Sequence, residues 1–139
     1  MPFELERQDA VLDNSPVIAI VDDDAPVIAA LQGLLRSLGF ASRAFSSARD
    51  FLASSAVGDC SCLISDVNMP SMDGFELQEA LAAEGHSIPT IFITAFANEH
   101  NEARALRAGA VCYLHKPFKV PALINCIEKA LQGPGTGHS

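Results

Sequence analysis

Basic residues are scarce in this 139-residue chain, because nine lysines and arginines stand against 17 aspartates and glutamates. The net charge of −8 repels a phosphate backbone, so we expect no direct binding to nucleic acid. Long apolar runs are also lacking, and no apolar block approaches the ~18 residues that span a bilayer. Residues 1–15 contain no apolar signal-peptide core. These absences predict a cytoplasmic chain that does not interact with a membrane.

The cysteines lack the spacing of a metal or redox site. The chain has four, at Cys60, Cys62, Cys112 and Cys126. The first two are separated by one residue rather than the two of a C-x-x-C motif, and no second pair follows. Cys62 and Cys112 lie inside apolar runs, where cysteine usually acts as a small hydrophobic residue. We therefore expect these cysteines to be buried and structural.

Short apolar segments are predicted as strands. Four of them are rich in β-branched residues and do not alternate strictly, which is typical of parallel strands covered on both faces. They lie at 17–21, 62–65, 90–94 and 111–114. A weaker candidate lies at 41–45.

Apolar residues at helical spacing fill the segments between and after these strands. A first helix lies between Asp24 and Gly39, a short one follows Ser47, and another follows Asp73. The segment 99–108 is helical by propensity, but Leu106 is its only large apolar residue, so this helix should be weakly held. A last helical stripe is predicted to end at Gly133 and Pro134.

The β-α unit therefore occurs five times, which predicts an α/β fold with an open, doubly wound parallel sheet and helices on both faces. We expect one domain over residues 16–132. Residues 1–15 are predicted to be an N-terminal tail, and the Gly- and Pro-rich residues 133–139 a C-terminal tail or the start of a linker.

Polar residues gather where the predicted strands end. Asp22 and Asp23 follow the first strand, Asp66 follows the third, Thr94 ends the fourth and Lys116 follows the fifth. Ligands of open α/β sheets bind at this carboxyl edge. Asp24 has a simpler interpretation as a helix cap, but helix capping does not account for the other three aspartates.

Three neighbouring carboxylates disfavour one another's ionisation unless a cation lies among them. A hard divalent ion with oxygen ligands, Mg²⁺ or Mn²⁺, suits the cluster of Asp22, Asp23 and Asp66. A carboxylate such as Asp66 can attack phosphorus and form an aspartyl phosphate. Lys116 and the Thr94 hydroxyl can then stabilise the charge that develops on the phosphoryl oxygens.

Four segments carry a family resemblance: VDDDAPV, ISDVNMPSMDGFEL, IPTIFITAF and RAGAVCYLHKPF. They resemble the response-regulator receivers, the family of the chemotaxis protein CheY, and among these the FixJ-type receivers. The resemblance runs from about Val17 to Leu131. It implies a flavodoxin-like five-stranded sheet in the order 2-1-3-4-5 and a two-component phosphorelay receiver. The phosphoryl donor is then a sensor histidine kinase or a phosphotransfer protein. Such a domain is not a turnover enzyme but catalyses its own phosphorylation and dephosphorylation.

The resemblance also implies roles for single residues. Asp66 matches the phosphoacceptor, and Asp22 and Asp23 match the acidic pair. The metal ligands are then these aspartates together with the backbone carbonyl of Asn68.

The remaining matches lie on the last two strands and the loops after them. Thr94 and Lys116 match the catalytic hydroxyl and lysine, and Thr94 is also the first switch residue. Tyr113 matches the switch aromatic, whose ring turns inward when the threonine hydroxyl moves to the phosphoryl group. The Lys116–Pro117 peptide bond matches one that is cis in the family.

Two further expectations concern the surface that carries the output signal and the lifetime of the phosphoryl group. The helix at 99–108, the last strand and the last helix form the face that the family numbers α4-β5-α5, and we expect this face to carry the signal and any homodimer contact. Asn68 and Phe96 flank the path of a hydrolysing water. A large apolar Phe96 cannot orient water, so we expect slow self-dephosphorylation.

Three other functions fit part of the pattern. A haloacid-dehalogenase-type phosphatase would use Asp22 and Asp24 as an Asp-x-Asp motif, but it leaves the Asp66 segment unexplained. A flavodoxin-like carrier of flavin mononucleotide shares the sheet order, but three aspartates would repel its phosphate. A degenerate receiver that acts only by binding proteins is disfavoured by the complete acidic, hydroxyl and lysine set. The resemblance leaves two organisations, because FixJ-type receivers usually precede a DNA-binding helix-turn-helix domain, whereas other receivers are stand-alone regulators.

Overall fold

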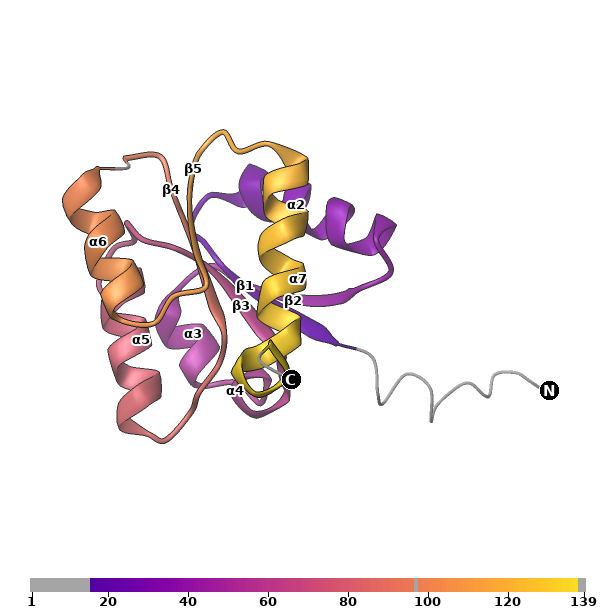
Figure 1. Cartoon of the computed structure of the whole chain (residues 1–139). Coiled ribbons are helices and arrows are strands. Elements are labelled where there is room, and N and C mark those ends of the chain that lie inside the picture. The colour runs from indigo at the N-terminus through magenta and orange to yellow at the C-terminus, as the bar shows by residue number, and fades with distance from the viewer. Residues whose placement is uncertain (1–15, 97, 138–139) are drawn as a thin grey trace.

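The computed structural model describes residues 16–96 and 98–137 and shows a twisted parallel sheet at the centre of the molecule (Figure 1). The five strands follow the order β2-β1-β3-β4-β5, which confirms the predicted topology. They are β1 (Val17–Val21), β2 (Ala41–Phe45), β3 (Cys62–Asp66), β4 (Thr90–Thr94) and β5 (Cys112–His115). The predicted N-terminal tail at 1–15 lies outside the described residues.

Helices connect the strands and follow the last one. They are α2 (Ala25–Ser37), α3 (Ala48–Leu52), α4 (Ala56–Asp59), α5 (Gly74–Ala83), α6 (Glu99–Arg107) and α7 (Val120–Gly137). Asp24, Ser47, Asp73 and Asn98 cap the starts of α2, α3, α5 and α6, because each side chain accepts a backbone N–H of the first turn. The connection from β2 to β3 contains two short helices where one was predicted.

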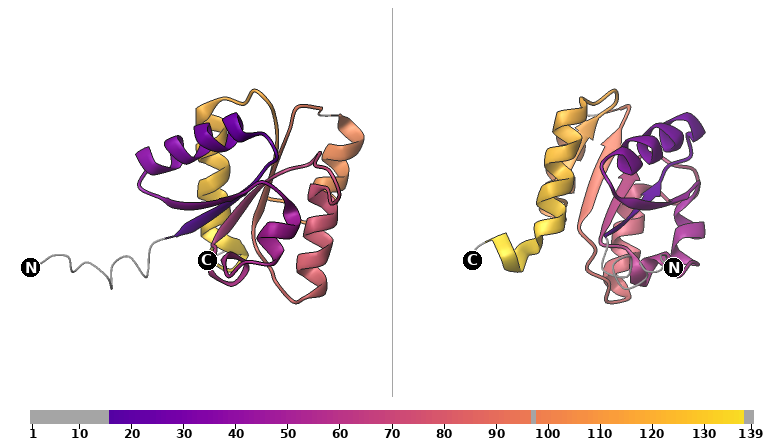
Figure 2. Two further views of the ribbon diagram at one scale, coloured as in Figure 1. Left: turned by 180° about the vertical axis from the view of Figure 1, so that it is seen from behind. Right: turned by 90° about the vertical axis from the view of Figure 1, so that its right-hand side faces the viewer.

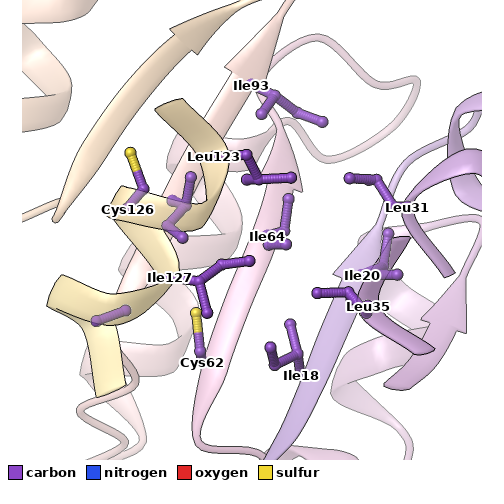
Figure 3. Packing of buried hydrophobic residues seen from close by; sticks show 12 residues of the cluster. Ile18, Ile20, Leu31, Leu35, Cys62, Ile64, Ile93, Leu123, Cys126 and Ile127 are labelled. Carbon is purple, nitrogen blue, oxygen red and sulfur yellow. The ribbon is translucent and has the colours of Figure 1, made fainter. Parts of the chain in front are cut away.

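The strand side chains alternate between two apolar layers, one on each face of the sheet. On one face Ile18, Ile20, Ile64 and Ile93 pack against Leu31 and Leu35 of α2 and against Leu123 and Ile127 of α7 (Figure 3). On the other face Ala19, Val21 and Leu63 pack against α3, α4 and α5. Burial of both faces explains why the central strands contain continuous apolar runs.

Two boundaries differ from the predictions. The last strand is β5 (Cys112–His115), an edge strand that is only partly buried rather than covered on both faces. The last helix continues past Gly133 and Pro134 to Gly137. The right-hand view of Figure 2 shows its end turning away from the axis of the rest of the helix. A proline lacks the N–H for one helical hydrogen bond and crowds the preceding turn, so it can bend a helix without ending it.

Helix α6 contacts the rest of the domain through a small residue and not through its one large apolar residue. Leu106, its only large apolar residue, is 51% exposed, whereas the small Ala105 is fully buried against Phe75 and Phe92. The guanidinium of Arg104 lies 4.3 Å from the centre of the Phe75 ring, a cation–π contact with α5. A single buried alanine is a small anchor, so the helix is held by limited apolar contact even though Leu106 does not supply it.

The cysteines are only partly as predicted. Cys62 is fully buried, as expected for a small core residue. Cys112 and Cys126, however, are joined by a disulfide between β5 and α7, which the sequence spacing did not indicate. The two lie 14 residues apart and meet only because the chain turns back after β5. Within the described residues, none of the helices is both long and apolar enough to cross a bilayer.

Candidate functional site

The candidate site lies at the carboxyl edge of the sheet, where β1, β3, β4 and β5 end. The parallel pairing sets neighbouring strand ends side by side, with Val21 opposite Ser65, Asp66 opposite Ile93 and Thr94 opposite His115. The loops after these strands therefore start close together. The parallel arrangement of the strands thus brings residues that are far apart in the sequence into one cluster.

The acidic part of the cluster contains Asp22, Asp23 and Asp66. One carboxylate oxygen of each lies within 4.8 Å of those of the other two. Asp22 is fully buried, Asp66 is 5% exposed and Asp23 is exposed. Burial, followed by the charge of the neighbouring Asp22, raises the pKa of the Asp66 carboxyl from 3.8 to about 6. Lys116 and the backbone N–H of Asn68 act in the opposite direction.

Such a cluster fits a hard divalent cation. Three carboxylate oxygens from separate residues converge, two of them from buried side chains that have lost most of their hydration. Burial first, and the charge of Asp22 second, make the ionised form of Asp66 unfavourable, which its raised pKa reflects. A cation among these oxygens would stabilise the ionised form, and Mg²⁺ prefers ligands of this kind.

Lys116 is the positive partner of the two buried carboxylates. Its Nζ lies 3.0 Å from Oδ2 of Asp22 and 3.4 Å from Oδ2 of Asp66. Burial alone would lower the pKa of this amine, but the two carboxylates outweigh that effect and raise it. The Lys116 backbone N–H donates to the Thr94 carbonyl at 2.7 Å, and the peptide bond to Pro117 is cis. The lysine thus stays protonated between Asp22 and Asp66.

Thr94 and Asn68 form a second, neutral part of the site. The buried Thr94 hydroxyl accepts hydrogen bonds from the Asn68 side-chain amide at 2.8 Å and from the Phe96 backbone N–H at 3.0 Å. The Asn68 backbone N–H donates to Oδ1 of Asp66 at 3.2 Å. Asn68 therefore contacts both Asp66 and Thr94, a linking position that the sequence reasoning had not assigned to its side chain.

Gly74 is a residue that the sequence reasoning missed. Its N–H donates to the Val67 carbonyl at 2.9 Å, which brings the start of α5 onto the end of β3. A Cβ atom added at Gly74 would lie 2.5 Å from the carbonyl oxygen of Asp66 and 3.0 Å from the Phe92 ring. Only glycine allows this approach. The signal for it was the glycine directly after the helix cap Asp73.

Tyr113 lies beside the site and not in it. Its ring packs with the cluster formed by Val67, Phe75, Phe92 and Ala105, under helix α6. The hydroxyl is buried and forms no hydrogen bond of good geometry among the described residues, although the backbone N–H of Asn98 is close enough to lower its pKa. Burial raises the pKa of this phenol. In the β4–β5 pairing Tyr113 stands opposite Phe92, two residues before Thr94. An inward ring with such a hydroxyl can gain a hydrogen-bond partner when the β4–α6 loop moves.

Phe96 and Asp24 lie at the margin of the site. The Phe96 side chain is 71% exposed, so only its backbone takes part in the hydrogen bonds of the site. Asp24 is the helix cap that the sequence predicted, since its Oδ1 accepts the Val27 N–H at 3.4 Å. A side chain used for capping is poorly suited to be the second aspartate of an Asp-x-Asp phosphatase motif.

Comparisons with known proteins show the family of the chain. Residues 18–128 match the family model described as "Response regulator receiver domain". The chain is 42% identical over 131 residues to the response regulator protein TmoT of Ectopseudomonas mendocina, covering 94% of this chain and 59% of that protein. It is 35% identical over 115 residues to the transcriptional regulatory protein FixJ of Bradyrhizobium diazoefficiens, covering 83% and 56%.

Solved structures of response regulators also superpose on this chain. The structure described as FixJ-N superposes with a TM-score of 0.77 at 36% identity, covering 86% of this chain and 95% of that one. The response regulator StyR superposes with a TM-score of 0.79 at 43% identity, covering 85% and 60%. The chain spans a little more than half the length of the curated relatives that it matches.

Proposed function

The chain belongs to the response-regulator receiver family and has the phosphorelay receiver role of that family, and we propose that Asp66 is the residue that accepts the phosphoryl group. One observation carries this proposal. Asp66 shares a cluster with Asp22 and Asp23, and the Lys116 amine bridges two of the three carboxylates. A nucleophilic carboxylate, a metal-binding acidic set and a fixed cation are the parts that phosphoryl transfer to aspartate requires.

In the proposed reaction a carboxylate oxygen of Asp66 attacks phosphorus while the bond from phosphorus to the donor's leaving group breaks. Lys116 moves its hydrogen bond from the Asp66 carboxylate to a phosphoryl oxygen, since in the acyl phosphate the carboxyl group has lost its negative charge and the phosphoryl oxygens carry it. Thr94 is suited to donate, because its oxygen accepts two hydrogen bonds and its own proton has no acceptor among the described residues. Both groups then stabilise charge on the phosphoryl oxygens.

Asp22, Asp23 and Asp66 would hold a divalent cation, with the Asn68 backbone carbonyl as a fourth protein ligand. When bound, Mg²⁺ or Mn²⁺ neutralises charge on the phosphoryl oxygens and orients them. Asp22 also accepts the Asp24 backbone N–H at 2.9 Å, a bond that orients its carboxylate. The acidic set is arranged before any donor binds, so little reorganisation is required.

The proposed output runs from Thr94 to the face made by α6, β5 and α7. If the Thr94 hydroxyl turns to a phosphoryl oxygen, its bonds to Asn68 and Phe96 change, and the β4–α6 loop with them. Tyr113 lies beneath α6 with a hydroxyl that forms no hydrogen bond of good geometry among the described residues, so it can respond to that change. The exposed Leu106 and Val120 provide apolar contact area on this face for a partner or for a second copy of the chain.

We also propose that the phosphoryl donor is a sensor histidine kinase or a phosphotransfer protein, and that the receiver belongs to a transcriptional regulator. The named relatives support this, since TmoT is a response regulator protein and FixJ a transcriptional regulatory protein, and the region shared with this chain covers 59% and 56% of their lengths.

The test is incubation with acetyl phosphate and Mg²⁺, followed by intact mass spectrometry. We expect the mass of one phosphoryl group to appear on the wild-type chain and on Asp59→Asn, which changes an exposed aspartate outside the site. Asp66→Asn should gain none, and the wild type should gain none when the metal is chelated. Phosphorylation that survives Asp66→Asn would refute the assignment.

The remaining alternatives give different outcomes in the same assay. A degenerate receiver would stay unmodified with both acetyl phosphate and a kinase. A phosphatase would release phosphate from a small ester with repeated turnover, and it would do so in Asp66→Asn. Only stoichiometric, metal-dependent modification that requires Asp66 supports the proposed function.

A further inference from the structure

The disulfide between Cys112 and Cys126 plays no part in the phosphorylation site. Their Cα atoms lie 5.9 Å apart, within the usual range of about 4.4–6.8 Å for a bridged pair, so the bond needs no displacement of the backbone. The other two cysteines, Cys60 and Cys62, are free thiols. Two of the four cysteines are therefore positioned for an internal bridge.

This bridge joins an edge strand to the helix that covers it. Within the described sheet, β5 pairs with β4 on one side only. Cys112 stands opposite Ile91 in that pairing and packs toward the α7 layer, whereas Cys126 is a buried residue of α7 itself. An edge strand has half the backbone ladder of a central one, so a covalent link to α7 is a substantial additional anchor.

The same strand carries Tyr113 on its other face. Successive side chains of a strand point to opposite faces, and here Cys112 contacts the α7 layer while Tyr113 contacts the cluster under α6. The loop closed by the bridge, from Cys112 to Cys126, also contains Lys116. The bridge therefore restrains the segment that links the site to the α6-β5-α7 face.

We propose that Cys112 and Cys126 are a reversible thiol–disulfide pair, and that the oxidised form fixes β5 to α7 and restricts the movement of Tyr113. The reversible thiol–disulfide pair does not depend on the proposed receiver function, whereas the restriction of Tyr113 rests on it. The oxidant is a low-molecular-weight disulfide such as oxidised glutathione.

The exchange proceeds in two steps. The thiolate of the half-buried Cys112 attacks one sulfur of the small disulfide, forms a mixed disulfide and releases one thiol. The thiolate of Cys126 then attacks the Cys112 sulfur and releases the second thiol. The protein loses two electrons and two protons, and the small disulfide is reduced to two thiols. Cys62 is fully buried and cannot reach a small disulfide, and burial raises the pKa of the Cys60 thiol to about 11, so Cys60 forms little of the thiolate that the first attack needs.

The redox test uses the whole chain, first fully reduced, then exposed to oxidised glutathione, quenched with acid and alkylated. Peptide mapping and intact mass should show two protected thiols joined as Cys112–Cys126, and a dithiol reductant should restore both. Cys60→Ser should behave as the wild type, and Cys112→Ser should form no internal bridge. Only glutathione adducts, links between chains, or a Cys60–Cys62 bridge would overturn the proposal.

The coupling test uses the fluorescence of Tyr113, which is the only tyrosine in a chain without tryptophan. Beryllofluoride with Mg²⁺ serves as the phosphoryl mimic for the reduced and oxidised protein. We expect the relative change in tyrosine emission to be at least twofold smaller in the oxidised form. An equal change overturns the coupling, and so does no change in either form. Intact-mass phosphorylation at Asp66 then shows separately whether the receiver function fails as well.

Discussion

Gly74→Ala should destabilise the protein although alanine is the better helix former. Gly74 is the first residue of α5, where alanine would be favoured by up to ~1 kcal/mol on helix propensity. Its added Cβ, however, would lie 2.5 Å from the carbonyl oxygen of Asp66 and 3.1 Å from the Cα of Val67. Both contacts are with backbone, which cannot rotate away as a flexible side chain could. The start of α5 or the end of β3 must therefore shift.

The magnitude follows from these opposing effects. Overpacking of a tightly packed site costs ~1–3 kcal/mol, and the cost lies toward the upper end when the obstacle is backbone. After subtraction of the helix-propensity gain we expect a net loss of about 1–2 kcal/mol in the free energy of unfolding. With a urea slope of about 1–3 kcal/mol per molar, the unfolding midpoint should fall by roughly 1 M.

The assay is urea unfolding followed by circular dichroism, with Gly33→Ala as the matched control. Gly33 lies in α2, and a Cβ there would meet nothing within 4 Å, so this variant should gain about 0.5–1 kcal/mol. Gly74→Ala should also slow phosphorylation by acetyl phosphate, because the strained contact is with Asp66 itself. A Gly74→Ala protein as stable as the wild type would refute the close-approach reasoning.

Three further substitutions test other parts of the structure. In metal-free buffer at pH 8, Asp66→Asn should raise stability by up to ~3 kcal/mol, since burial and Asp22 raise the Asp66 pKa from 3.8 to about 6. This gain should shrink as the pH falls below about 6 and vanish below 3.8, where the acid is neutral in both folded and unfolded chains; equal stability at pH 8 contradicts it. Phe96→Asp should speed loss of the phosphoryl group in a mass-spectrometric time course, because a carboxylate can orient water, and an unchanged or slower rate contradicts this. Leu106→Ala should change the free energy of unfolding, measured by urea unfolding, by less than about 0.5 kcal/mol, because the side chain is half exposed and Ala105 anchors the helix. A loss above about 1 kcal/mol contradicts this.

The parallel sheet and the clustering of the site could be anticipated from local patterns, whereas the strand order was implied by the family resemblance. Continuous apolar runs such as Val17–Val21 and Thr90–Thr94 indicate parallel strands, and parallel strands have their carboxyl ends at one edge. The polar residues directly after these runs were thereby expected to meet. Helix caps such as Asp24 and Asp73 could also be predicted from the sequence, because capping depends on a few neighbouring residues.

The misplaced details depend on contacts between distant segments. The weak hold of α6 was expected, but the burial of Ala105 rather than Leu106 was not, because hydropathy does not tell which side of a short helix faces Phe75 and Phe92. The same limit applies to Cys112 and Cys126, whose pairing depends on how α7 crosses the edge strand.

The sequence by itself determined the fold class and the residues at the carboxyl edge, because strand-forming runs and the residues that end them are encoded locally. Only the tertiary structure decided how those residues interact. It placed Lys116 between Asp22 and Asp66, joined Asn68 to Thr94, and pressed Gly74 against the backbone of Asp66. Distances of a few ångströms between segments dozens of residues apart are set by packing of the whole domain, and no local pattern contains them.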